Sequence, residues 1–119
     1  MQHERVPIYV ELRDGDGRPV RRLPDPSGGT FDAAGDFDRF VNESYIGLGQ
    51  DLDLSTLGKI DPYADTEMHP DHMAALLEDI AQVLPRAKAG PELRGLLRLQ
   101  VMAKACAADP DSAMVWIGD

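Results

Sequence analysis

The sequence predicts an α+β fold, in which an antiparallel sheet of about four strands carries a helix pair packed on one face. Near the N-terminus apolar and polar residues alternate, which is typical of a strand with one buried face. Residues 69–108 instead repeat their apolar residues with the period of a helix. Helices that follow a run of strands segregate to one face of an antiparallel sheet, so this order of elements favours the α+β class. With 119 residues, the chain is expected to form one domain over residues 1–119.

The first two predicted strands form a β-hairpin. Val6–Leu12 alternates between apolar and polar side chains, which predicts a strand. The following Asp14–Gly17 holds two glycines, which accept the backbone angles of a tight turn. The returning strand, Arg18–Leu23, is short and basic, as is typical of the edge of a sheet.

One helix and one strand are predicted in the middle of the chain. In Asp36–Tyr45, apolar residues recur at positions i, i+3, i+4 and i+8, which predicts a short helix. Thr56–Ile60 is predicted to be the third strand of the sheet.

The clearest helix in the sequence is predicted to start just after His69. Pro70 suits a first helical turn, because its missing N–H would have no partner there. Apolar residues then recur at helical spacing from Met73 to Leu84, and Pro85 is predicted to end the helix.

A second helix and a final strand are predicted to follow. The helix is expected from Glu92 to about Ala108, antiparallel to the first because the connection is short. Ala113–Ile117 is apolar and contains Val, Trp and Ile, which predicts a strand that pairs within the sheet, with the first strand as its candidate neighbour. Whether this strand is central or at an edge stays open. The helical stripe expected to face the core is Leu93, Leu96, Leu97, Val101 and Ala105, widened by Leu99, Met102 and Cys106.

Composition and charge exclude several classes of function. The formal net charge of −9 disfavours binding to nucleic acid and to anionic membranes, since both are polyanions. No apolar stretch approaches the roughly 20 residues that span a bilayer, and the first residues lack the pattern of a signal peptide. A single cysteine excludes an internal disulfide and fits a reducing compartment. We therefore expect a cytoplasmic protein that binds neither nucleic acid nor membrane.

The sharpest candidate for chemistry is a cluster of acids and histidines. Carboxylate and imidazole groups bind zinc, manganese or iron, and His69-x-x-His72 has a usable local spacing. Asp65 and Glu67 are the candidate carboxylate ligands. No glutamate of the H-E-x-x-H type accompanies the histidines, and acids here also suit turns and the start of a helix. Turn formation and helix capping are therefore favoured over a metal site.

No complete catalytic or cofactor-binding motif is present, so no cofactor is expected. The serines lack the G-x-S-x-G pattern, and Gly28-Gly29-Thr30 lacks the lysine of a phosphate-binding loop. Asp14-Gly-Asp-Gly lacks the other ligands of a calcium loop. Cys106, among alanines on a helix, is predicted to be a buried and unreactive thiol with a raised pKa.

Two stretches carry a resemblance to a known group of proteins. They are Ile60-Asp61-x-Tyr63-x-Asp65-Thr66 and the ending Trp116-Ile117-Gly118-Asp119. With the helix pair between them, they resemble a group of small, mostly actinobacterial proteins of no established activity. The resemblance covers roughly the C-terminal half of the chain and implies the fold outline. In size and acidity, the chain is also similar to immunity proteins of bacterial toxin systems.

These observations favour a non-enzymatic, immunity-like or adaptor protein that presents an acidic surface to a basic protein partner. The candidate partner-binding residues are Asp61, Tyr63, Asp65 and Asp119. The alternative is a small metal-binding protein or metal-dependent enzyme that uses the His69/His72 cluster. Mimicry of nucleic acid by the acids between Asp32 and Asp79 is disfavoured, because glycines and turns interrupt them. The oligomeric state stays open.

Overall fold

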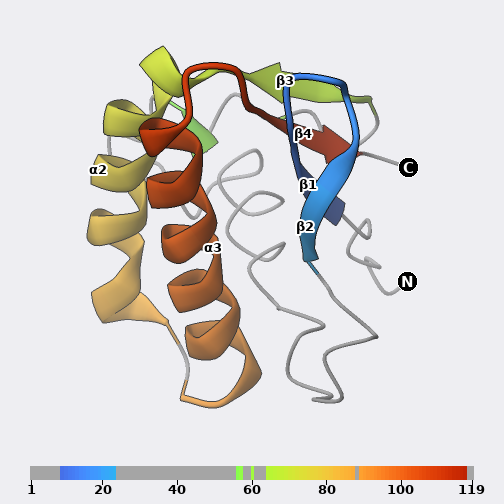
Figure 1. The fold of residues 1–119 in the computed structure, drawn as a ribbon. Coiled ribbons are helices and arrows are strands. Elements are labelled where there is room, and N and C mark those ends of the chain that lie inside the picture. The colour runs from blue at the N-terminus through green and yellow to red at the C-terminus, as the bar shows by residue number, and fades with distance from the viewer. Residues whose placement is uncertain (1–8, 24–55, 58–59, 61–63, 88, 118–119) are drawn as a thin grey trace.

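The computed structural model describes residues 9–23, 56–57, 60, 64–87 and 89–117. In these residues, helices α2 and α3 lie side by side on one side of a four-stranded antiparallel sheet (Figure 1). The predicted α+β architecture is therefore confirmed. In chain order the elements are β1 (Tyr9–Arg13), β2 (Pro19–Leu23), β3 (Thr66–Met68), the 3-10 turn η5 (Pro70–His72), α2 (Met73–Val83), the 3-10 turn η6 (Leu84–Arg86), α3 (Pro91–Ala108) and β4 (Ala113–Ile117).

The strand order of the sheet is β2-β1-β4-β3. The last strand, β4, lies between β1 and β3, so its predicted pairing with the first strand is confirmed, and its position, which the sequence leaves open, is central. Met114 of β4 is opposite Leu12 of β1 on one side and Met68 of β3 on the other. β2 is at the edge of the sheet, as its basic sequence predicts.

The core lies between the inner face of the sheet and the two helices. Trp116 of β4 is fully buried, as are Leu76 and Ile80 of α2. Burial of an aliphatic or aromatic side chain of this size contributes about 1.5–3 kcal/mol to folding. The buried side chains of the sheet are Val10, Leu12, Leu23, Met68, Met114, Val115 and Trp116.

The prediction of a third strand at Thr56–Ile60 is wrong for the residues of this stretch that are described. Thr56 and Leu57 form a turn, and the third strand is instead β3. The cause is the buried carboxylate of Asp79, whose Oδ2 accepts the backbone N–H groups of Thr56 and Leu57 at 2.7 and 2.8 Å. Because these donors bind a side chain, they do not bind a neighbouring strand.

The predicted bounds of both helices are close to those observed. The first helix starts with η5 at Pro70, and α2 ends at Val83 before the turn η6, which contains Pro85. The second, α3, begins one residue earlier than predicted and ends at Ala108.

The predicted buried stripe of α3 is wrong in part. Leu97 and Val101 are 43% and 52% exposed. Apolar residues occupy more than one face of this helix, so two overlapping stripes have helical spacing and only one can face the core. The side chains of α3 that are buried are Leu96, Leu99, Met102, Ala103 and Cys106.

The predicted helix Asp36–Tyr45 and the first residues of the predicted strand Val6–Leu12 lie outside the described residues. Within the described part of the chain, neither helix combines the length and apolar character needed to cross a membrane.

Candidate functional site

Three turns meet at one end of the sheet, and the register of the strands places them there. Arg13 is opposite Ala113, so the turn that follows β1 and the turn that precedes β4 share this end. Met68 is opposite Met114, so the residues that follow β3 are at the same end (Figure 1). We call this the acidic end, and define it by its five aspartates: Asp14, Asp16, Asp71, Asp109 and Asp111.

The β1–β2 turn and the α3–β4 turn are in direct contact. A Cβ at Gly15 would lie 3.2 Å from the Cβ of Asp111, which is closer than side chains normally approach. The absence of a side chain at Gly15 therefore lets the two aspartate-bearing turns adjoin. Asp16 follows this glycine directly, so Asp16 and Asp111 belong to adjoining turns.

Two of the five aspartates, Asp14 and Asp109, stabilise the turns in which they lie through hydrogen bonds to the backbone. Oδ1 of Asp14 accepts the backbone N–H groups of Asp16 and Arg18, each at 2.9 Å. Oδ1 of Asp109 accepts the backbone N–H of Asp111 at 3.0 Å. Side-chain bonds of this kind stabilise a tight turn. The exposed carboxylates of Asp16 and Asp111 make no hydrogen bond or ion pair with any described residue.

The two histidines beside the acidic end form a helix cap. The backbone N–H of His69 donates to Nδ1 of His72 at 3.0 Å, and the two rings are 6.1 Å apart. Asp71 Oδ1 lies 3.5 Å from the same Nδ1. The bond from the His69 backbone to the His72 side chain is of the kind that caps the start of a helix.

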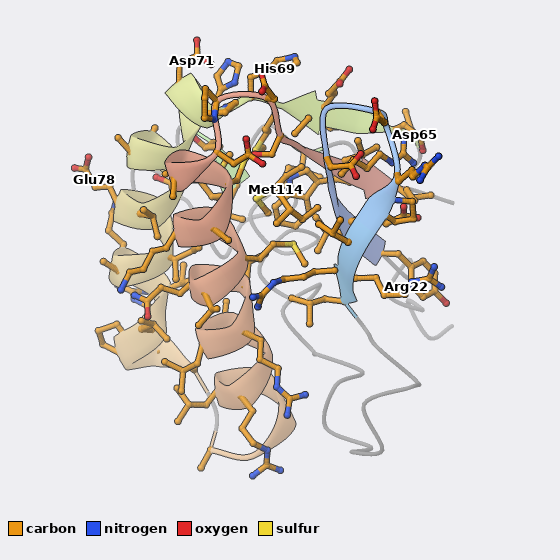
Figure 2. All side chains as sticks on the ribbon, viewed as in Figure 1. Arg22, Asp65, His69, Asp71, Glu78 and Met114 are labelled. Atoms are coloured by element: carbon orange, nitrogen blue, oxygen red, sulfur yellow. The ribbon has the colours of Figure 1, made fainter. Side chains whose placement is uncertain are left out.

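The structure does not bring the four candidate metal ligands together. Glu67 is on the outer face of β3, since the next residue, Met68, points into the core. Asp65 precedes β3, at the opposite end of that strand from His69, and Figure 2 shows the two side chains well apart. Among the described residues, no group of three His, Cys, Asp or Glu side chains is arranged to hold a metal ion.

Of the predicted partner-binding residues, only Asp65 can be placed. Its side chain is exposed just before β3, at the opposite end of that strand from η5. Asp61, Tyr63 and Asp119 lie outside the described residues.

Cys106 is a buried thiol, as predicted. Burial raises its pKa, a hydrogen bond from Ser112 lowers it, and the nearby charge of Asp109 raises it further. The Ser112 hydroxyl lies 3.3 Å from the sulfur. It lies closer still, at 2.8 Å, to the carbonyl oxygen of Asp109, so it also ties the end of α3 to the following turn.

The parts of the acidic end can be predicted from the sequence, but their proximity cannot. Asp14–Gly17 and Asp109-Pro110-Asp111 have the composition of turns, and Asp71 has that of a helix start. Their proximity depends on the register of β1, β3 and β4, which no local pattern contains. Asp79 was also missed, since an acid on a helix gives no sign of being buried.

No protein-family model, no curated protein and no solved structure matches this chain. The resemblance to small actinobacterial proteins, carried by residues 60–66 and 116–119, thus stays an expectation.

Proposed function

We propose that the protein is a non-enzymatic binding domain that captures a basic protein partner through its acidic end. The observation that carries this proposal is the meeting of the β1–β2 and α3–β4 turns. This meeting places the exposed carboxylates of Asp16 and Asp111, which make no bond with any described residue, on adjoining turns.

The charge of the acidic end suits recognition of lysine and arginine. The three turns, residues 14–18, 69–72 and 109–112, contain five aspartates against one arginine, Arg18. Exposed charges of one sign attract an oppositely charged partner over about 8–10 Å at ordinary salt concentrations. Such attraction mainly raises the association rate and makes it sensitive to salt.

The exposure of these carboxylates favours binding over catalysis. Asp16, Asp71 and Asp111 are all exposed to solvent. A carboxylate that acts as a general acid or base at neutral pH needs a pKa shifted by a desolvated environment. Capture of a basic surface needs the opposite, a charged group that a partner can reach.

Affinity capture with matched variants tests the proposal. The chain is immobilised, exposed to cell lysate at low salt, and eluted with a salt gradient. The test variant is Asp16→Asn/Asp111→Asn. The control, Glu67→Gln/Glu78→Gln, removes the same charge elsewhere. Glu67 is on the outer face of β3, and Glu78 is exposed on α2, where Figure 2 labels it.

The proposal predicts a basic protein that the unmodified chain and the control retain and that the test variant loses. Equal retention by both variants would show that net charge alone, rather than the acidic end, binds the protein. The proposal would then fail.

A further inference from the structure

We infer that the outer edge of β2 is a second docking site, which takes an extended acidic peptide as an added strand. This site goes beyond the proposed function, because it involves a different surface and a partner of opposite charge.

Within the described part of the chain, the backbone of β2 is paired on one side only. β2 is the last strand of the sheet, and the described residues pair only with its inner edge. Pro19 to Arg22 are exposed, whereas Leu23 is buried and fixes the end of the strand in the core. In an antiparallel sheet every second residue points its N–H and C=O away from its partner strand. These outward groups of an edge strand can bind the backbone of another chain.

Two arginines of β2 flank this edge on opposite faces of the sheet. Arg21 is opposite Leu12, whose side chain points into the core, so Arg21 belongs to the helix-covered face. Arg22 is opposite Glu11 on the other face, and Figure 2 shows it pointing away from the helices. Neither arginine forms an ion pair with a described residue. Glu11, the nearest acid by register, is 3.4 Å from Nε of Arg13 instead.

This arrangement selects the charge of the added strand. Opposite charges on directly facing positions of neighbouring strands stabilise the pair, and like charges destabilise it. An added strand places consecutive side chains on alternate faces, so it meets Arg21 on one face and Arg22 on the other. The matching ligand is therefore an extended peptide with two adjacent acidic residues.

A second copy of this chain is disfavoured as the occupant. If two β2 edges paired antiparallel with these positions aligned, arginine would face arginine. Arg21 would be opposite Arg21 when both helix layers lie on the same side, and opposite Arg22 when one copy is turned over. Like charges directly opposite destabilise such a pair. Basic residues on an edge strand are a known protection against self-pairing. Val20 is 56% exposed and β-branched, so it offers an apolar contact to an added strand.

Fluorescence anisotropy with a defined peptide tests the inference. The probe is a short labelled peptide of threonine and valine with two adjacent glutamates at its centre. One control peptide replaces the glutamates with glutamines, and a second keeps them but carries N-methyl groups on alternate backbone amides. N-methylation leaves the charge intact and removes the donors that a strand needs.

We expect Arg21→Gln/Arg22→Gln to weaken binding of the glutamate peptide about three- to tenfold, as two facing charge pairs imply. Lys104→Gln/Arg86→Gln, which removes the same charge from the helix layer, should leave the affinity unchanged. A charge swap keeps the test independent of folding: Arg21→Glu/Arg22→Glu should bind the corresponding lysine peptide instead.

Three results would overturn the inference. They are no binding of the glutamate peptide at low salt, equal binding of the N-methylated peptide, and concentration-dependent dimerisation that Arg21→Gln/Arg22→Gln strengthens and the peptide leaves unchanged. The acidic end is untouched by these variants, so its partner should still bind to them. Failure of this docking site and failure of the proposed function are thus separate outcomes.

Discussion

The carboxylate of Asp79 on α2 binds the backbone N–H of Leu57, 22 residues earlier in the chain, at 2.8 Å. The same oxygen binds the N–H of Thr56, and Asp79 is only 2% exposed. A buried acid that satisfies two backbone donors fixes the residues that carry them. This contact brings Leu57, a buried core residue, to α2.

Replacement of Asp79 should be strongly destabilising. Asp79→Ala leaves the N–H groups of Thr56 and Leu57 buried without this acceptor, so we expect unfolding free energy to fall by about 2–4 kcal/mol. Glu78→Ala, at the neighbouring exposed position of α2, should change it little. Urea unfolding monitored by circular dichroism measures both. A loss at Asp79 no larger than at Glu78 would show that this bond does not hold the turn.

The indole N–H of Trp116 donates to Sδ of Met68 at 3.3 Å, which joins β4 to β3 inside the core. Met68→Ala should cost about 2–5 kcal/mol of unfolding free energy because it leaves a cavity beside the indole. Met68→Leu keeps the volume and should cost less than about 1.5 kcal/mol. Trp116 is the only tryptophan, so its fluorescence reports both unfolding and the local change. Equal losses in the two variants would contradict close packing at this site.

The two faces of α3 should differ sharply in their response to mutation. Leu99→Ala removes a fully buried side chain and should lower unfolding free energy by about 2–5 kcal/mol. Leu97→Ala, at a 43% exposed position of the same helix, should stay within about 0.5 kcal/mol of the unmodified chain. Thermal and urea unfolding compare them. A large loss of unfolding free energy in Leu97→Ala would instead support the buried stripe that the sequence predicts.

The thiol of Cys106 should make stability fall at alkaline pH. Burial raises its pKa in the folded state, so the unfolded chain releases this proton at lower pH than the folded chain does. The thiol's contribution to stability is therefore complete below the unfolded pKa and is lost as pH rises through the folded one. Urea unfolding at several pH values compares the chain with Cys106→Ala. Parallel stability curves across the alkaline range would contradict the raised pKa.

Alternation, charge and helical period in the sequence correctly predict those elements whose structure depends on nearby residues. The bounds of β4, the edge position of β2 and the end of α3 follow from alternation, charge and helical period. β3 was misplaced because a side chain 22 residues away, Asp79, binds the backbone of the stretch that looks like a strand. The buried face of α3 was misjudged because its apolar residues permit two stripes.

The candidate site follows the same rule. Asp14 and Asp109 are recognisable as turn residues, and both hold turns. Their neighbours Asp16 and Asp111 form part of a common surface only through strand register and the bare backbone of Gly15. Such proximity is a property of the fold, and the sequence around each turn does not contain it.

The most direct measurement for the central claim is the association rate of the captured basic protein, followed at low and at high salt. Asp16→Asn/Asp111→Asn should slow association severalfold at low salt, and the difference should shrink as salt rises. Glu67→Gln/Glu78→Gln should leave the rate close to that of the unmodified chain. Association slowed equally by both pairs, or a difference that salt leaves unchanged, would contradict electrostatic capture by the acidic end.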